Sequence, residues 1–377
     1  MKLGIQPPYG EQTINRKYKP LRVLSNEDIE QLLTMPECIE VLEEMYGDYA
    51  NGQALLVPRI DNLSPSSESG AYYGFKQMGG AWPRKRVQAL RINSDIITHP
   101  IIAGKPRRVK EPKANGRWVG LVFMFSSDTG ALLGIFPDGA MQRLRVGAAN
   151  GIALKYLARE DSKTLAIIGS GWQAGGQLMA ALAVRPFKQV RVFSPRSASR
   201  CAFVAEAKLR HPDIEILDID TAEECVDSAD VIMAATSSMI RVLEPTWLKP
   251  GVHISCIKSQ EVDQVLLDGC DRIVVHVTAQ PKQYDNIMPG TPNVSAEHIS
   301  GWWNVPGNRF AEYPDLAQLV AGNSPGRESA SDITCFVNNV GVGLQFAAAG
   351  ALVLEKARTA GLGHELPDDW FSETVHP

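Results

Sequence analysis

Three arginines in the first 145 residues stand among apolar or small neighbours. Arg59 follows Val57-Pro58, Arg91 follows Ala89-Leu90, and Arg145 precedes Val-Gly-Ala-Ala. A guanidinium in such surroundings is costly unless it meets an anion, and its planar donors match a carboxylate with two parallel hydrogen bonds. One such arginine alone indicates a structural ion pair. Three of them, ahead of a nucleotide-binding motif, predict a clamp for the carboxylate of a small substrate.

That motif is a glycine-rich turn between an apolar strand, Thr164–Ile168, and an apolar-faced helix. Gly169 permits a tight turn, Gly171 lets the backbone approach a pyrophosphate, and the small Ala174 lets the helix pack on the strand. Free N–H groups at the start of that helix favour the pyrophosphate. The alternative is a glycine turn in an unrelated α/β domain. The predicted dinucleotide contacts are Gly169, Ser170, Gly171, Trp172, Gln173 and Ala174.

The end of the second strand distinguishes the two nicotinamide dinucleotides. An NAD site usually has Asp or Glu there, to bind the ribose 2′-hydroxyl. Here the strand ends in Ser194-Pro-Arg196-Ser197, with Arg200 close behind and no carboxylate among them. Arg196 can pair with a 2′-phosphate, so the sequence predicts NADP(H) in preference to NAD(H). If both arginines are only solvated, NAD(H) remains possible.

A polar run, Thr236-Ser237-Ser238, follows the fourth strand. The carboxyl ends of parallel strands line the ligand crevice of an open α/β sheet. Thr236 is therefore a candidate contact to the ribose–nicotinamide half of the cofactor, with Ser237 and Ser238 beside it. A helix cap is an equal alternative for this threonine.

Short apolar strands alternate with helices from Lys163 onward. This pattern predicts βαβ units and a doubly wound parallel sheet of the Rossmann type. We assign the nucleotide-binding domain to residues 146–324. The predicted strands are Thr164–Ile168, Gln189–Phe193, Glu215–Asp218, Val231–Ala235, Val252–Ile257 and Arg272–Val277.

The flanking segments must position the arginines. The predicted elements are a helical stretch at 25–51, sheet at 71–100, a strand pair at 118–136, and helices at 143–158 and 331–360. Between the sheet segments, residues 101–118 hold six basic side chains against Glu111. They could form a lid that attracts an acidic substrate or phosphate, but we favour a solvated hairpin loop.

Composition limits the remaining possibilities. A chain of 377 residues predicts two domains, and a net charge of −4 argues against nucleic-acid or membrane partners. Six scattered cysteines without a C-x-x-C pair predict reduced thiols. Seven histidines without paired spacing predict no metal site. We expect Met1–Pro20 to be a loose arm without a signal peptide, and the protein to be cytoplasmic.

Several short stretches, read together, are similar to one known family. They are Val57-Pro-Arg59, Gly130-Ala-Leu-Leu, Arg145-Val-Gly-Ala-Ala, Lys155-Tyr-Leu-Ala158, Ile168-Gly-Ser-Gly-Trp-Gln-Ala174, Trp247-Leu-Lys-Pro-Gly-Val-His253, Gly326-Arg327 and Asp332-Ile-Thr334. From Leu21 to about Gly363 the chain resembles the ornithine cyclodeaminase/μ-crystallin family. That group includes cyclodeaminases, archaeal-type alanine dehydrogenase and imine-reducing enzymes.

The resemblance implies an α+β substrate-binding and dimerisation domain, residues 1–145 plus 325–377, into which the Rossmann domain is inserted. It implies a homodimer, with Arg59 and Arg145 on the substrate carboxylate. Family members place a Lys near the reacting nitrogen. Two alignments are open for that position, and they give Arg91 or Lys76.

Two departures weaken the case for ornithine cyclodeamination. Cyclodeaminases carry an Asp shortly after the fifth-strand His, whereas His253 here leads to Lys258 and Glu261. Gln345 stands where many relatives have an acidic residue. The chain therefore has no evident base for the amine protons at these positions.

The hypothesis that results is hydride transfer between NADPH and a C=N carbon beside a carboxylate. The substrate is a small amino, imino or keto acid. Arg91 could bind a second carboxylate, which makes an imino diacid a specific possibility. The proton donor stays open among Lys76, Lys258, Glu261 and water. The alternatives are a redox-neutral cyclodeaminase of the ornithine or lysine type and a non-catalytic NADPH-binding protein.

Overall fold

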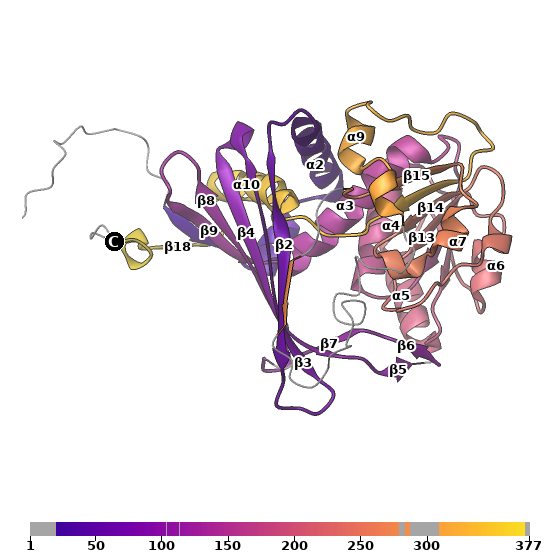
Figure 1. Ribbon diagram of the computed structural model, residues 1–377, viewed down its shortest axis with the longest axis horizontal. Helices are drawn as coiled ribbons and strands as arrows, with labels where there is room; N and C mark the ends of the chain where they lie inside the picture. Colours follow the sequence, from indigo (N-terminus) through magenta and orange to yellow (C-terminus); the bar gives the residue numbers. More distant parts are fainter. Residues whose placement is uncertain (1–19, 103, 113, 279–282, 287–308, 374–377) are drawn as a thin grey trace, which may run out of the picture.

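The computed structural model describes residues 20–102, 104–112, 114–278, 283–286 and 309–373. Two sheets lie side by side, one built mainly from the N-terminal part of the chain and one from its middle (Figure 1). The predicted N-terminal arm, apart from Pro20, falls outside the described residues. No described helix is long and apolar enough to cross a membrane.

The first sheet has nine strands in the order β16-β2-β3-β4-β8-β9-β1-β18, with β7 paired to β4. Residues along β4 alternate between buried and partly exposed, as expected where one face of a sheet is covered. The strands are β1 (Leu21–Val23), β2 (Leu55–Pro65), β3 (Tyr72–Trp82), β4 (Val87–Thr98), β7 (Val109–Glu111), β8 (Val119–Ser126), β9 (Leu132–Pro137), β16 (Gln283–Asn286) and β18 (His364–Leu366).

Helix α10 (Leu344–Ala360) packs on β3 and β4, and α2 (Met35–Ala50) and α1 (Asn26–Leu32) pack against it. The start of α10 approaches the sheet so closely that a Cβ at Gly343 would lie 2.3 Å from the backbone nitrogen of Gly79. Two glycines therefore meet where helix and sheet touch. The predicted helical stretch 25–51 is two helices, because Ser25 and Thr34 each form a capping box.

The second sheet has seven parallel strands in the order β12-β11-β10-β13-β14-β17-β15. Helices α3 (Gly139–Leu157), α4 (Trp172–Val184) and α5 (Ser197–Arg210) border one apolar core, and α6 (Ala222–Val226) and α7 (Gln264–Leu267) border another. The strand order reverses between β10 and β13, which confirms the predicted Rossmann fold. The strands are β10 (Thr164–Ile168), β11 (Gln189–Phe193), β12 (Glu215–Asp218), β13 (Val231–Ala234), β14 (His253–Cys256), β15 (Arg272–Val275) and β17 (Thr334–Val337).

The helix predicted at 331–360 is wrong in its first half, because Thr334–Val337 is strand β17. All four residues are buried on both faces, and such a run lacks the alternation that would identify a strand. The boundary predicted at 324/325 therefore falls before the last strand of the nucleotide-binding sheet. The boundary predicted at 145/146 falls inside α3, which packs against both α2 and α4.

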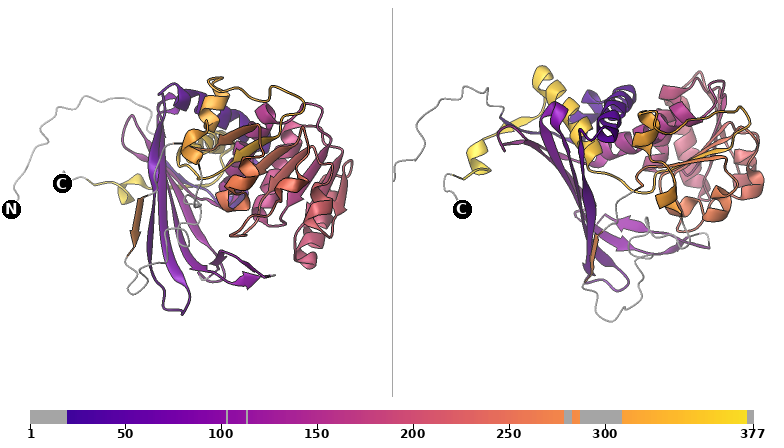
Figure 2. Two further views of the ribbon diagram at one scale, coloured as in Figure 1. Left: turned by 45° about the vertical axis from the view of Figure 1, so that its right-hand side comes forward. Right: turned by 45° about the horizontal axis from the view of Figure 1, so that its top comes forward.

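A basic arm, residues 101–111, leaves the first sheet after β4 and reaches the second sheet (Figures 1 and 2). It contains β5 (Ile101–Ile102), β6 (Lys105–Pro106) and β7. The N–H of Met239 donates to the carbonyl of Pro106 at 3.1 Å, and Arg107 forms a β-bridge with Ser238. The solvated loop that we favoured is therefore wrong for this part of the segment.

Candidate active site

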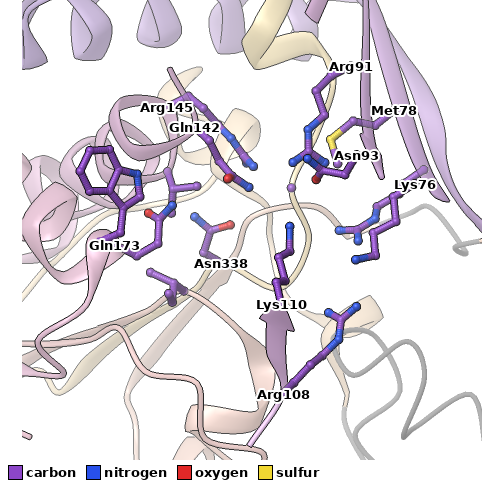
Figure 3. A pocket seen from close by; sticks show the side chains of 15 residues that line it. Lys76, Met78, Arg91, Asn93, Arg108, Lys110, Gln142, Arg145, Gln173 and Asn338 are labelled. Carbon is purple, nitrogen blue, oxygen red and sulfur yellow. The ribbon is translucent and has the colours of Figure 1, made fainter. Parts of the chain in front are cut away.

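A cavity of about 280 Å³ lies between the two sheets. Figure 3 shows its side chains converging from β3, β4, α3, α4, the basic arm and the end of β17. Among the described residues that line it, none is acidic and six are cationic. These six are Arg59, Lys76, Arg91, Arg108, Lys110 and Arg145.

Antiparallel pairing of β2, β3 and β4 places several of these cations beside one another. Lys76 lies opposite Asp61 on β2 and opposite Asn93 on β4. The Arg59 guanidinium donates to Asp61 at 2.6 and 3.0 Å. Asp61 is 1% exposed, so it neutralises Arg59 from behind the cavity wall.

One buried carboxylate serves two lysines. The Oδ2 atom of Asp95 lies 2.8 Å from the Nζ of Lys76 and 3.0 Å from the Nζ of Lys110. Lys76 and Asp95 are almost fully buried, whereas about a third of the Lys110 side chain is exposed. Because two ammonium groups share one carboxylate, this corner of the cavity carries a net positive charge.

Arg91 points to the cavity but is bound to a carboxylate. Its Nε donates to Asp138 at 2.7 Å and its Nη2 lies 2.5 Å from the same oxygen. The Asn93 amide donates to that oxygen at 3.1 Å. Asp138 directly precedes α3, so this cluster joins β4 to the helix that carries Arg145.

Arg145 has a neutral partner. Its Nη1 donates to the amide oxygen of Gln345 at 2.9 Å, and no carboxylate of the described residues forms an ion pair with it. The Gln345 amide nitrogen donates to Tyr46, whose hydroxyl lies 2.5 Å from His276. His276 is in turn 2.5 Å from the carbonyl of Val340. This buried chain of polar groups fixes the orientation of Arg145.

Burial, and after it the charge of Arg91, lower the pKa of Arg145 to about 9. The guanidinium therefore remains charged at neutral pH. Its Nε has no acceptor among the described residues. A substrate carboxylate would satisfy both the charge and this donor.

Lys76 has the electrostatics of a proton donor. Burial lowers the pKa of its ammonium group well below the usual 10.5, and the charges of Arg108 and Lys110 lower it further. Asp95 opposes the shift. A lysine with a lowered pKa releases its proton more readily than an ordinary lysine.

A second cavity, of about 670 Å³, follows the carboxyl ends of β10, β11 and β13. It meets the first cavity at Trp172, Gln173 and Ile257 and at two residues of the arm, Arg108 and Lys110. The predicted cofactor contacts that line it are Gly169, Ser170, Gly171, Trp172, Gln173, Ser194, Arg196, Thr236 and Ser237.

The glycine-rich turn has the shape that a dinucleotide requires. Gly169 has a φ of +123°, and a Cβ there would lie 2.2 Å from the carbonyl oxygen of Ala235. A Cβ at Gly171 would meet nothing within 4 Å, so the backbone is open to a ligand. No side chain caps the start of α4, whose N–H groups can therefore bind a pyrophosphate.

Arg200 does not face this cleft as a phosphate ligand. It pairs with Asp218 and Asp220 and donates to the carbonyl of Ser194 at 3.0 Å. Asp218 ends the neighbouring strand β12 and Asp220 lies two residues beyond it, so the fold brings both carboxylates to Arg200. Arg196 is exposed and lines the cleft, and Ser197 begins α5 beside it.

Four further predicted site residues line neither cavity. They are Ser238, Ala174, Lys258 and Glu261. The Ser238 hydroxyl donates to the carbonyl of Ile240 at 2.8 Å, and Ala174 is fully buried. Both carboxylate oxygens of Glu261 accept main-chain N–H groups, from Thr236 and Ile257. Glu261 thus joins the ends of β13 and β14 and is set back from the substrate cavity.

Lys258 is also set back from the substrate cavity. It is 4% exposed, and burial lowers its pKa to about 8 in spite of the attraction of Glu261. Arg108 and Lys110 line the substrate cavity but are not among the predicted site residues, although their basic segment was an available signal. Asn338 also lines it, and it could have been found only by identifying strand β17, which it follows.

A family model described as "Ornithine cyclodeaminase/mu-crystallin family" matches residues 21–361. Alanine dehydrogenase of Archaeoglobus fulgidus is 28% identical over 91% of this chain and 97% of its own length. Iminosuccinate reductase of Paracoccus denitrificans is 27% identical over 91% of this chain and 99% of its own length.

Among solved structures, an archaeal alanine dehydrogenase dimer with bound NAD matches with a TM-score of 0.73 and 25% identity. It covers 92% of this chain and 99% of the other. The match extends over both sheets and the site between them, and it confirms the resemblance found in the sequence. The chain belongs to the ornithine cyclodeaminase/mu-crystallin family.

Proposed function

We propose that this protein reduces an α-imino acid to an amino acid, or runs the reverse dehydrogenation, with a nicotinamide dinucleotide. The observation that carries the proposal is a cationic cavity joined to a dinucleotide cleft, in which Arg145 pairs with a neutral amide. Relatives named alanine dehydrogenase and iminosuccinate reductase support this reaction class.

We propose NADP(H) as the preferred cofactor. Arg196 stands at the end of β11, where an NAD-specific site usually has a carboxylate. The matched archaeal structure holds NAD, so NAD(H) is the competing cofactor. Gly169, Gly171 and the start of α4 would hold the pyrophosphate of either one. When bound, the dinucleotide supplies the hydride that reduces the C=N carbon.

Side chains of this protein bind the substrate and supply the proton. Arg145, with Arg59 beside it, binds the substrate carboxylate and fixes the C=N carbon at the junction of the two cavities. The Lys76 ammonium gives its proton to the substrate nitrogen, so that the C=N group gains one hydride and one proton. Asp95 keeps Lys76 oriented through the 2.8 Å contact.

We propose that the substrate is an imino diacid. Arg91 was the residue predicted for a second carboxylate, but it is bound to Asp138. Lys110 would bind the second carboxylate instead. Lys76 and Lys110 share one carboxylate and line the cavity opposite Arg145. An α-carboxylate on Arg145 and a second carboxylate near Lys110 would balance these charges.

Cyclodeamination of a diamino acid is the competing reaction. It needs a base for the amine protons, and no carboxylate lines the described part of the cavity. A second amino group would also meet several cations there. Both features favour a substrate with an anionic side chain.

We also propose a homodimer, as in the matched alanine dehydrogenase structure. The six cysteines are all free thiols, which suits the reducing cytoplasm that we expected.

The test is the loss of nicotinamide absorbance from NADPH with purified protein, a 2-oxo acid and ammonia. Oxaloacetate with ammonia should support faster oxidation than pyruvate with ammonia, and neither oxo acid should suffice without the amine. Dinucleotide binding without oxidation on any oxo acid would contradict the proposal and favour a binding protein.

A further inference from the structure

Arg107 lies on the basic arm of the first sheet and lines the second cavity. Its side chain is 93% buried, since 7% is exposed. It lines the dinucleotide cleft together with Arg196 of the nucleotide-binding sheet. The β-bridge to Ser238 holds its backbone beside the end of β13.

The surroundings of Arg107 are electrostatically unfavourable without an anion. Burial lowers the pKa of its guanidinium, and the charge of Arg196 lowers it further. Glu261 acts in the opposite direction from a distance, while its own oxygens accept main-chain N–H groups. Within the described part of the chain, no carboxylate forms an ion pair with Arg107. A buried cation beside a second cation is costly unless an anion is bound.

We propose that Arg107 binds a phosphate group of the dinucleotide, across the cleft from Arg196. The group is either the 2′-phosphate of NADPH or the pyrophosphate common to both cofactors. This inference rests on the proposed cofactor binding and adds a residue from outside the Rossmann fold. The guanidinium of arginine suits a phosphate ligand well, because two of its N–H groups can donate to two phosphate oxygens at once.

The position of Arg107 in the arm has a consequence for the substrate. The next residue, Arg108, and the nearby Lys110 line the substrate cavity. A phosphate held by Arg107 therefore fixes the segment that carries two substrate-facing cations. The cofactor should bind first, and its binding should strengthen that of the substrate.

The experiment measures Kd for NADPH and NADH, by nicotinamide fluorescence without substrate, in the full chain and in Arg107→Gln. The matched control is Arg117→Gln, which removes the same charge from an exposed position beyond the arm. Arg107→Gln should weaken NADPH binding about 10-fold or more, and Arg117→Gln should leave it unchanged. Arg107→Lys keeps a charge and should retain part of the affinity, which separates lost binding from lost folding.

Comparing the Kd changes for NADPH and NADH identifies which phosphate group Arg107 binds. A loss for NADPH alone assigns Arg107 to the 2′-phosphate, and an equal loss for NADH assigns it to the pyrophosphate. Unchanged Kd values for both cofactors in a folded Arg107→Gln protein would overturn the inference. If the unaltered protein bound neither dinucleotide, the proposed function itself would fail.

Discussion

The Nη1 atom of Arg145 lies 2.9 Å from the amide oxygen of Gln345, and this neutral partner leaves the charge of the guanidinium uncompensated. Arg59 and Arg91, by contrast, are each bound to a buried aspartate. The substrate carboxylate should therefore be held mainly by Arg145. Arg145 differs from Arg59 and Arg91 in its net charge environment because its partner on α10, Gln345, is neutral.

Gln345→Glu should raise the substrate KM by about 10-fold or more, because a charge-assisted ion pair would then compete with the substrate. Steady-state kinetics with a fixed, saturating NADPH concentration would measure it. Gln345→Met removes the amide without adding a charge and should raise KM less. Equal KM values for Gln345→Glu and the unaltered protein would show that Arg145 does not hold the carboxylate.

Lys76 should set the alkaline limit of the reductive reaction. Its lowered pKa means that the ammonium proton is lost well below pH 10.5, so kcat/KM should fall as pH rises through that lowered pKa. Lys76→Arg keeps the charge but donates no proton in this range, and kcat should drop by about 100-fold or more. A Lys76→Arg enzyme with the original rate and pH profile would assign the proton to water.

Lys110 should select for a second carboxylate. Lys110→Met should reduce kcat/KM for oxaloacetate with ammonia by about 10-fold or more, and it should change the value for pyruvate with ammonia much less. Lys85→Met is the control, since Lys85 is exposed and lies away from the substrate cavity. If both oxo acids lost activity equally in Lys110→Met, the second-carboxylate role would be wrong.

Arg196 and Arg200 should behave differently, although they are four positions apart. Arg196→Asp should shift the ratio of the NADPH and NADH Kd values toward NADH by about 100-fold. Arg200→Met removes the ion pairs with Asp218 and Asp220, so it should lower Tm by about 2–4 °C with a smaller change in that ratio. Cofactor titration and thermal unfolding of both variants would test this. The reverse pattern would make Arg200 the phosphate ligand.

The Rossmann sheet could be predicted from local sequence because its strands and the turn at Gly169 lie in consecutive βαβ units. Arg59 and Arg145 could be singled out for a similar reason, since charges among apolar neighbours are visible in one segment. Lys76 entered as an alternative to Arg91, and both line the cavity.

Contacts between distant segments could not be predicted in the same way. The aspartates that bind Arg91 and Arg200 are brought close by strand pairing and by helix packing. The arm that carries Arg107 looked like an ordinary basic loop, because its docking on the segment after β13 depends on the relative position of two sheets. Strand β17 was missed because a short, fully buried run has no distinctive period.

The most direct test of the account uses NADPH that carries deuterium at both positions of nicotinamide C4, with oxaloacetate and ammonia, and mass spectrometry of the amino-acid product. Hydride transfer to an imino diacid predicts aspartate with deuterium at its α-carbon, formed in the same amount as NADP⁺. Oxidation of NADPH without deuterated aspartate, or bound NADPH that is never oxidised, would contradict the proposed reaction.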